Sequence, residues 1–210
     1  MQREKRVIEF YVLCNKLKDL VRTGWQNWNV NRHRVESVAE HIYGVQMLAI
    51  AMWAEFKYDL DIKKTLTMIA VHEMEETIIG DITCFQKTKE EKVKLGHQAV
   101  VDIFKKLCNA DEIRELIFEF EKRQTLESQF AYFCDKLECD IQAKLYDEQG
   151  CVDLNMQEQN ETAKNEDVKK LLTTGMSWAE MWLTYGQERY NYDENFLAVS
   201  DYVKNNKIIK

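Results

Sequence analysis

The sequence predicts an all-α protein. It contains no proline and only seven glycines in 210 residues, and these two residue types are the usual interruptions of long helices. Apolar residues recur at intervals of three and four along most of the chain, as they do on the buried face of an amphipathic helix. No stretch shows a convincing strand pattern. We therefore expect a helical bundle of roughly seven to nine helices.

The first half of the chain divides into helices by apolar spacing and by capping patterns. A helix over 7–21 is followed by a loop over 22–28, in which Gly24 ends the helix. Ser37 with Glu40 three residues later forms a capping box, which opens a helix that reaches about residue 56. Asp61 is a suitable N-cap for a helix that ends at Gly80.

The second half follows the same rules. Helices are expected at about 89–107, 111–121, 127–146 and 177–185, the last of them opened by a Ser177–Glu180 capping box. A final helix is expected over about 194–205, and the polar stretch 147–165 between these elements is predicted to be a loop.

The bulk composition restricts the class of partner. The formal net charge is −7 and the pI is near 5.3, which argues against a nucleic-acid polymer or an anionic membrane as the main partner. A small phosphate ligand is compatible with this charge, because it needs only a local patch or a metal ion. The six cysteines form no C-x-x-C pair, and no apolar run has the length of a transmembrane helix. We expect reduced thiols in a cytoplasmic protein.

The stretch Ala70–Ile82 contains the most informative residues. The apolar stripe of the preceding helix continues, at the same helical spacing, onto His72, Glu73 and Glu76. Carboxylates near the end of a helix are disfavoured by its dipole, and a carboxylate that faces a core needs a cation. A divalent cation held between these groups removes both penalties. The alternative is a solvated acidic helix end, which suits Glu75 well.

Two further residues turn this stretch into a possible metal site. His41 lies on the inward face of the helix that follows Ser37, and Asp135 lies at the edge of the buried stripe of the helix over 127–146. By itself a single inward histidine is more often a core residue, and a single helical aspartate is usually solvated. Two imidazoles and two carboxylates on separate helices, however, suit one divalent ion with open coordination positions and hydrolytic chemistry.

The sequence pattern around these residues resembles that of the HD-domain metal-dependent phosphohydrolases. More narrowly, it resembles the branch that contains the bacterial 5′-deoxynucleotidases. The matching runs span about two-thirds of the chain in the order of the family. They are Arg22–Trp25, Val35–His41, His72–Ile82, and Glu127–Ser128 leading to Asp135–Glu138 and Gln142–Ala143.

The resemblance implies both a ligand set and an activity. The implied ligands of one divalent metal ion (Mn, Co, Fe, Ni, Zn or Mg) are His41, His72, Glu73 and Asp135. The implied activity is hydrolysis of (deoxy)nucleoside 5′-monophosphates to nucleoside and phosphate. The remaining implied site residues are Asp81 for proton transfer, Glu76 to orient water or the sugar, and Arg22 and Trp25 to contact the substrate.

The resemblance also implies an overall organisation. We expect a single HD domain over 1–210, with a metal-binding core at about 34–146 and C-terminal helices at about 165–205 packed on it. Relatives in this branch are commonly dimers, so a homodimer is expected as well.

One residue departs from the family pattern. The aspartate that gives the family its name is Glu73 in this chain. Its extra methylene shifts the carboxylate unless the helix or the rotamer compensates, and catalytic geometry tolerates small displacements poorly. The alternative hypothesis is therefore a catalytically impaired HD-fold protein that binds a nucleotide or a protein partner. Retention of Glu76 and Asp81 weighs against this alternative.

Overall fold

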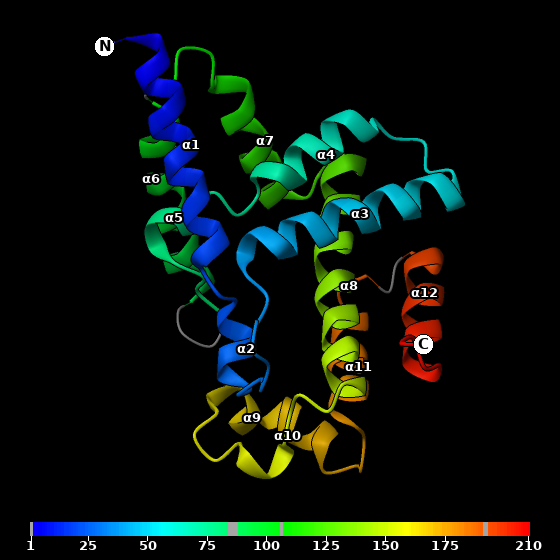
Figure 1. The fold of residues 1–210 in the computed structure, drawn as a ribbon. Helices are drawn as coiled ribbons and strands as arrows, with labels where there is room; N and C mark the ends of the chain where they lie inside the picture. The colour runs from blue at the N-terminus through cyan, green and yellow to red at the C-terminus, as the bar shows by residue number, and fades with distance from the viewer. Residues whose placement is uncertain (1, 84–87, 106, 191–192) are drawn as a thin grey trace. The chain divides into compact units, whose positions relative to one another are not determined.

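The computed structural model describes residues 2–83, 88–105, 107–190 and 193–210, and most of these residues are helical (Figure 1). The described residues form no strand, and their one extended pairing is an isolated antiparallel bridge between Val21 and Ser37. The predicted all-α class is confirmed. The chain divides into two compact units, one of residues up to Thr23 with Glu36–Tyr132, the other of Gly24–Val35 with Phe133–Lys210. The expected single domain over 1–210 stays a prediction.

The first unit is built from helices that pack against one another in pairs. Helix α4 contacts α3 and α7, α1 contacts α3 and α5, and α6 contacts α5 and α7. The helices of this unit are α1 (Arg3–Asp19), α3 (Val38–Phe56), α4 (Ile62–Val71), α5 (Glu76–Ile79), α6 (Lys89–Phe104), α7 (Asp111–Lys122) and the beginning of α8 (Leu126–Glu148).

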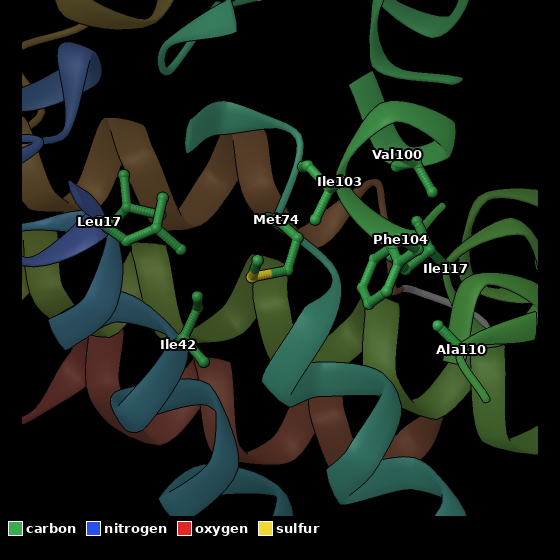
Figure 2. Close-up of a cluster of buried hydrophobic side chains, with 9 residues drawn as sticks. Leu17, Ile42, Met74, Val100, Ile103, Phe104, Ala110 and Ile117 are labelled. Atoms are coloured by element: carbon green, nitrogen blue, oxygen red, sulfur yellow. The ribbon is translucent and has the colours of Figure 1, made fainter. Parts of the chain in front are cut away.

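The apolar core of the first unit joins helices that are distant in sequence. Met74, from the turn after α4, lies in the middle of this cluster, with Leu17 and Ile42 on one side and Ile103 and Phe104 on the other (Figure 2). Burial of one such side chain contributes about 1.5–3 kcal/mol. The segment that carries His72 and Glu73 is therefore held in place by the side chain that follows them.

The second unit has an aromatic core. Trp25, Trp28 and Trp178 are each buried, and the rings of Trp25 and Trp178 meet edge to face at 6.1 Å between centroids. The elements of this unit are most of α2 (Thr23–Asn27), the rest of α8, a 3-10 helix at Leu154–Met156, α9 (Glu161–Lys164), α10 (Glu166–Leu172), α11 (Trp178–Gln187) and α12 (Glu194–Asn205).

A buried polar network joins three elements of the second unit. The Tyr190 hydroxyl donates to Oδ2 of Asp140 at 2.6 Å and lies 3.0 Å from the Ser200 hydroxyl. Burial raises the pKa of Asp140 to about 8, against the lowering effect of this hydrogen bond. A Cβ added at Gly186 would stand 1.8 Å from Asp140 Oδ2, so this position of α11 requires glycine.

Several local predictions are confirmed and others are wrong. The two capping boxes, the Asp61 cap and the last helix are present as expected. The predicted loop over 22–28 contains the short helix α2, and Gly24 lies inside that helix. The stretch 147–165 also contains short helices, because Asp153 and Asn160 cap them through their side chains.

The predicted reduced thiols agree with the structure. The described cysteines, at positions 14, 108, 134, 139 and 151, form no disulfide bond, and Cys84 lies outside the described residues. None of the helices formed by the described residues is both long and apolar enough to span a membrane.

Candidate functional site

The site of the first unit begins where the chain passes Arg22. The peptide N–H of Arg22 donates to the carbonyl of Glu36 at 3.0 Å, and Val21 pairs with Ser37. The hydroxyl of Ser37 accepts from the Glu40 N–H and starts α3. One short backbone pairing therefore fixes both Arg22 and the start of the helix that carries the first histidine.

Two buried imidazoles face each other on α3 and at the end of α4. The rings of His41 and His72 are 5.8 Å apart between centroids, and both side chains are almost fully buried. Nδ1 of His72 lies 2.7 Å from the carbonyl oxygen of Ile69. Because a carbonyl only accepts, Nδ1 carries the hydrogen and Nε2 keeps its lone pair. In metal sites a hydrogen bond of this kind from the other ring nitrogen commonly fixes the tautomer of a ligating histidine.

The backbone between α4 and α5 is wound more tightly than an α-helix. The predicted helix through Gly80 is wrong, because α4 ends at Val71 and the N–H groups of Met74 and Glu76 bond to carbonyls three residues earlier. In such turns the side chains three residues apart eclipse each other. Glu75 is buried and its side chain lies against Gly96, which corrects its interpretation as a solvated helix end.

Glu73 connects the histidines to Arg22. Its Oε1 lies 3.6 Å from Nε2 of His72 and 3.6 Å from Nη1 of Arg22. The ligand atoms of His41, His72 and Glu73 lie within 4.8 Å of one another. Two imidazole nitrogens and a carboxylate oxygen within this distance form a donor set that suits a divalent transition metal. The extra methylene of Glu73 does not carry its carboxylate away from the histidines.

Asp81 lies on the other side of Arg22. Its Oδ2 accepts the peptide N–H of Thr23 at 2.7 Å and lies 3.8 Å from Nε of Arg22. The Thr23 hydroxyl donates to the backbone carbonyl of Asp81 at 2.6 Å. Gly80, with a φ of 78°, turns the chain into this position. Asp81 is therefore held by both its backbone and its side chain.

Two buried glutamates of this site have raised pKa values, which favour their protonated, neutral form. Burial and the neighbouring charge of Glu73 raise the pKa of Glu75 to about 8. The pKa of Glu76 is also raised well above its usual range, first by burial and then by the charges of Glu73 and Asp81. Within the described part of the chain, neither carboxylate oxygen of Glu76 has a hydrogen-bond partner. Strongly raised carboxyl pKa values of this kind are typical of functional sites.

Lys92 is the site residue that sequence reasoning missed. Its Nζ lies 3.6 Å from Oε1 of Glu76. Burial alone would lower its pKa, but the surrounding carboxylates outweigh this effect and raise it. The signal in the sequence is its position one helical turn before Gly96, a small buried residue that faces Glu75. A lysine in line with such a residue lies on the inward side of α6.

Asp135 and Trp25 belong to the second unit. Asp135 is a buried carboxylate on α8, 2.6 Å from Nζ of Lys136. Trp25 is 2% exposed, and its ring packs against the rings of Tyr146 and Trp178. Its burial favours a packing role, and its contact with a substrate stays a prediction.

The comparison with protein families identifies the chain. The HD domain family matches residues 14–174, which is most of the sequence. The chain belongs to the HD domain family. The resemblance seen in the sequence is thereby confirmed, and the pair formed by His41 on α3 and His72 at the end of α4 occurs in an HD-domain fold.

Curated relatives and a solved structure agree with this family. The chain is 35% identical over 150 residues to the 5′-deoxynucleotidase HDDC2 of Dictyostelium discoideum, covering 68% of this chain and 78% of that protein. It is 32% identical over 139 residues to the 5′-deoxynucleotidase hdd1 of Schizosaccharomyces pombe, covering 63% and 68%. A conserved hypothetical protein from Pyrococcus furiosus superposes with a TM-score of 0.61 at 27% identity, covering 80% of this chain and 97% of that one.

Proposed function

We propose that this HD-domain protein is a metal-dependent phosphohydrolase that converts (deoxy)nucleoside 5′-monophosphates to nucleoside and phosphate. The observation that carries the proposal is the grouping of His41, His72 and Glu73 next to the Arg22–Asp81 pair in one unit. The curated relatives named as 5′-deoxynucleotidases support the choice of substrate.

The donor set of the first unit fits a divalent ion, which His41, His72 and Glu73 would hold. We propose Asp135 as the fourth ligand, because it is a buried carboxylate on α8, the helix that begins in the first unit. When bound, such an ion acidifies water and polarises a phosphoryl oxygen. The proposed native ion is one of Mn, Co, Fe, Ni, Zn or Mg, and metal analysis of the purified protein identifies it.

The protein's own groups supply charge and proton handling. Arg22 presents a guanidinium that matches phosphoryl oxygens in a bidentate geometry and stabilises their charge. Asp81, held by the Thr23 N–H, is the proposed group for proton transfer. Glu76 is the proposed group that orients water or the sugar. The raised pKa of Glu76 keeps a proton available on it, so it can donate as well as accept a hydrogen bond.

Glu73 is proposed to replace the family aspartate without loss of activity. The tight turn after Val71 changes the direction of the side chains that follow, and the Glu73 carboxylate lies 3.6 Å from His72 Nε2. Under the alternative of an impaired protein, Glu73→Asp would increase bound metal and turnover. Under our proposal Glu73→Asp changes turnover by less than about threefold, a change below 1 kcal/mol.

The decisive experiment is phosphate release from a panel of deoxynucleoside and ribonucleoside 5′-monophosphates, with each candidate metal added to metal-stripped protein. We expect turnover that depends on the metal and that falls by about 10²–10⁴ in Asp81→Asn. The metal content of this variant should match that of the unmodified protein. Turnover no higher than that of Asp81→Asn with every metal would overturn the proposal.

Three further features are proposed with it. The partner is a small nucleotide and not a nucleic-acid polymer, supported by the net charge of −7. The location is cytoplasmic, supported by the free cysteines of the described residues. The protein is proposed to be a homodimer, which light scattering after gel filtration tests directly.

A further inference from the structure

We propose that Lys92 is a second phosphate-binding cation, which contacts the phosphoryl oxygens of the substrate together with Arg22. This inference rests on the proposed function for the identity of the substrate. It assigns to α6 a role in substrate binding that the sequence patterns did not indicate.

The first support is the placement of the Lys92 ammonium. Its side chain is 34% exposed, whereas the side chain of Glu76, 3.6 Å away, is 1% exposed. Nζ therefore stands between a buried carboxylate and solvent. The helix is held close to the acidic turn, because a Cβ at Gly96, one turn further along α6, would lie 3.4 Å from Cγ of Glu75. A ligand that enters from solvent would meet this ammonium before it reached Glu76.

The second support is the incomplete pairing between Lys92 and Glu76. A separation of 3.6 Å is longer than a hydrogen bond between an ammonium and a carboxylate. Both Glu76 oxygens are buried and have no hydrogen-bond partner in the described chain. An ammonium has three donors on a flexible stem. The Lys92 ammonium can therefore donate to phosphoryl oxygens while it stays close to the carboxylate of Glu76.

The third support is the charge of the site. Four carboxylates gather in this part of the first unit, and among the described residues Arg22 and Lys92 are the cations that lie near them. A phosphate monoester dianion that enters such a site is repelled unless positive groups face it. Arg22 pairs with two carboxylates and Lys92 with one, so Lys92 supplies a second positive group that can face the anion together with Arg22. The four carboxylates are Glu73, Glu75, Glu76 and Asp81.

The test is phosphate affinity in Lys92→Met, Lys92→Arg and the matched control Lys94→Met, whose lysine is exposed on the same helix. The probe is inorganic phosphate, with its Kd measured by calorimetry on the full chain at saturating metal. Metal content and urea unfolding are measured on the same samples. KM and kcat for a nucleoside 5′-monophosphate are measured separately.

We expect Lys92→Met to weaken phosphate binding and to raise KM by about tenfold or more, the loss typical of one charge-assisted hydrogen bond. Lys92→Arg should stay within about threefold of the unmodified protein, and Lys94→Met should be unchanged. A phosphate Kd in Lys92→Met within twofold of the unmodified value overturns the proposal. A fall in kcat alone also overturns it, because it would make Lys92 only a support for Glu76.

The failure of this inference is distinguishable from failure of the proposed function. If the unmodified protein binds phosphate but hydrolyses no nucleotide, the proposed function is wrong, and the phosphate Kd of the variants still decides the role of Lys92. If it hydrolyses nucleotides and Lys92→Met binds phosphate as tightly, the role of Lys92 is wrong and the proposed function stands.

Discussion

Each compact unit buries a carboxyl group whose pKa is raised to about 8 by burial, but the two groups have different partners. Asp140 in the second unit receives the Tyr190 hydroxyl at 2.6 Å, next to Ser200. Glu75 in the first unit has an oxygen with no hydrogen-bond partner among the described residues, and the charge of Glu73 raises its pKa further. In the second unit the carboxyl of Asp140 has a neutral hydrogen-bond donor. In the first unit Glu75 lies close to another carboxylate, Glu73, which repels its negative charge.

This difference separates a structural polar cluster from a functional one. A buried polar group that keeps its hydrogen bonds adds specificity at little net cost, whereas an unpaired one costs about 1–3 kcal/mol. The first unit tolerates that cost where a cation and an anionic substrate are proposed to bind. Changes in the Asp140 cluster should therefore reduce stability, and changes in the cluster of Glu75 and Glu76 should reduce activity.

The largest expected effect is that of Gly186→Ala in the second unit. The new Cβ would overlap Asp140 Oδ2 at 1.8 Å, and Asp140 cannot move without losing Tyr190. We expect a loss of about 3 kcal/mol or more in the free energy of unfolding, measured by urea denaturation. Gly24→Ala is the control, because a Cβ there meets nothing within 4 Å. Equal stability of the two variants would contradict the packing described here.

The opposite behaviour is expected of Glu76→Gln in the first unit. It keeps the shape of the side chain but removes a carboxyl that faces other acids, so the unfolding midpoint should stay equal or rise. The kcat/KM for a nucleoside 5′-monophosphate should fall about a hundredfold, because the reacting water or sugar is no longer oriented. Glu90→Gln, at an exposed position of α6, serves as the control. A Glu76→Gln variant that is less stable but fully active would contradict the assignment of a functional role to this cluster.

A smaller effect is expected of Tyr190→Phe. It removes one hydroxyl and leaves Asp140 without its donor, at an expected cost of about 2 kcal/mol in the free energy of unfolding. Tyr202→Phe is the matched change at an exposed position of α12. If both variants unfold at the same urea concentration, the hydroxyl of Tyr190 contributes nothing to the second unit.

The last expected effect is a pH dependence of stability, which Asp140→Asn removes. Because the pKa of Asp140 is about 8 in the folded chain and near 4 in the unfolded chain, the folded chain alone holds the proton between these values. The stability of the unmodified protein relative to Asp140→Asn should therefore fall as the pH rises from about 4 to about 8. The slope should be at most about 1.4 kcal/mol per pH unit. Parallel stability curves for the two proteins would show that Asp140 keeps an ordinary pKa.

The elements that local sequence rules determine were predicted well. The capping box at Ser37 and the N-cap at Asp61 depend on residues within one turn, and both are present. The last helix, Glu194–Asn205, follows its apolar spacing. The pair of histidines was predicted because each shares a face with apolar residues on its own helix.

The remaining features depend on contacts that the spacing does not encode. The sequence predicted an uninterrupted helix across Val71, and in such a helix Glu75 would be exposed to solvent. In the structure the turns after Val71 are tighter, Met74 packs in the core, and Glu75 is buried. Lys92 was missed for a related reason, since its role appears only when α6 packs against α5. Asp140 lies one turn from the buried Leu137, so helical spacing indicates that it faces inward. The spacing does not indicate that Tyr190 is its hydrogen-bond partner.

The bridge between Val21 and Ser37 has a consequence for how this region can vary among relatives. The bridge joins the two ends of the segment formed by residues 24–35. The position of Arg22 is therefore set by its backbone pairing with Glu36 and not by the length of this segment. Residues 31–34 are exposed, and doubling the length of a flexible loop costs only about 0.6 kcal/mol. Insertions there can lengthen the segment while the backbone of Arg22 stays paired with Glu36.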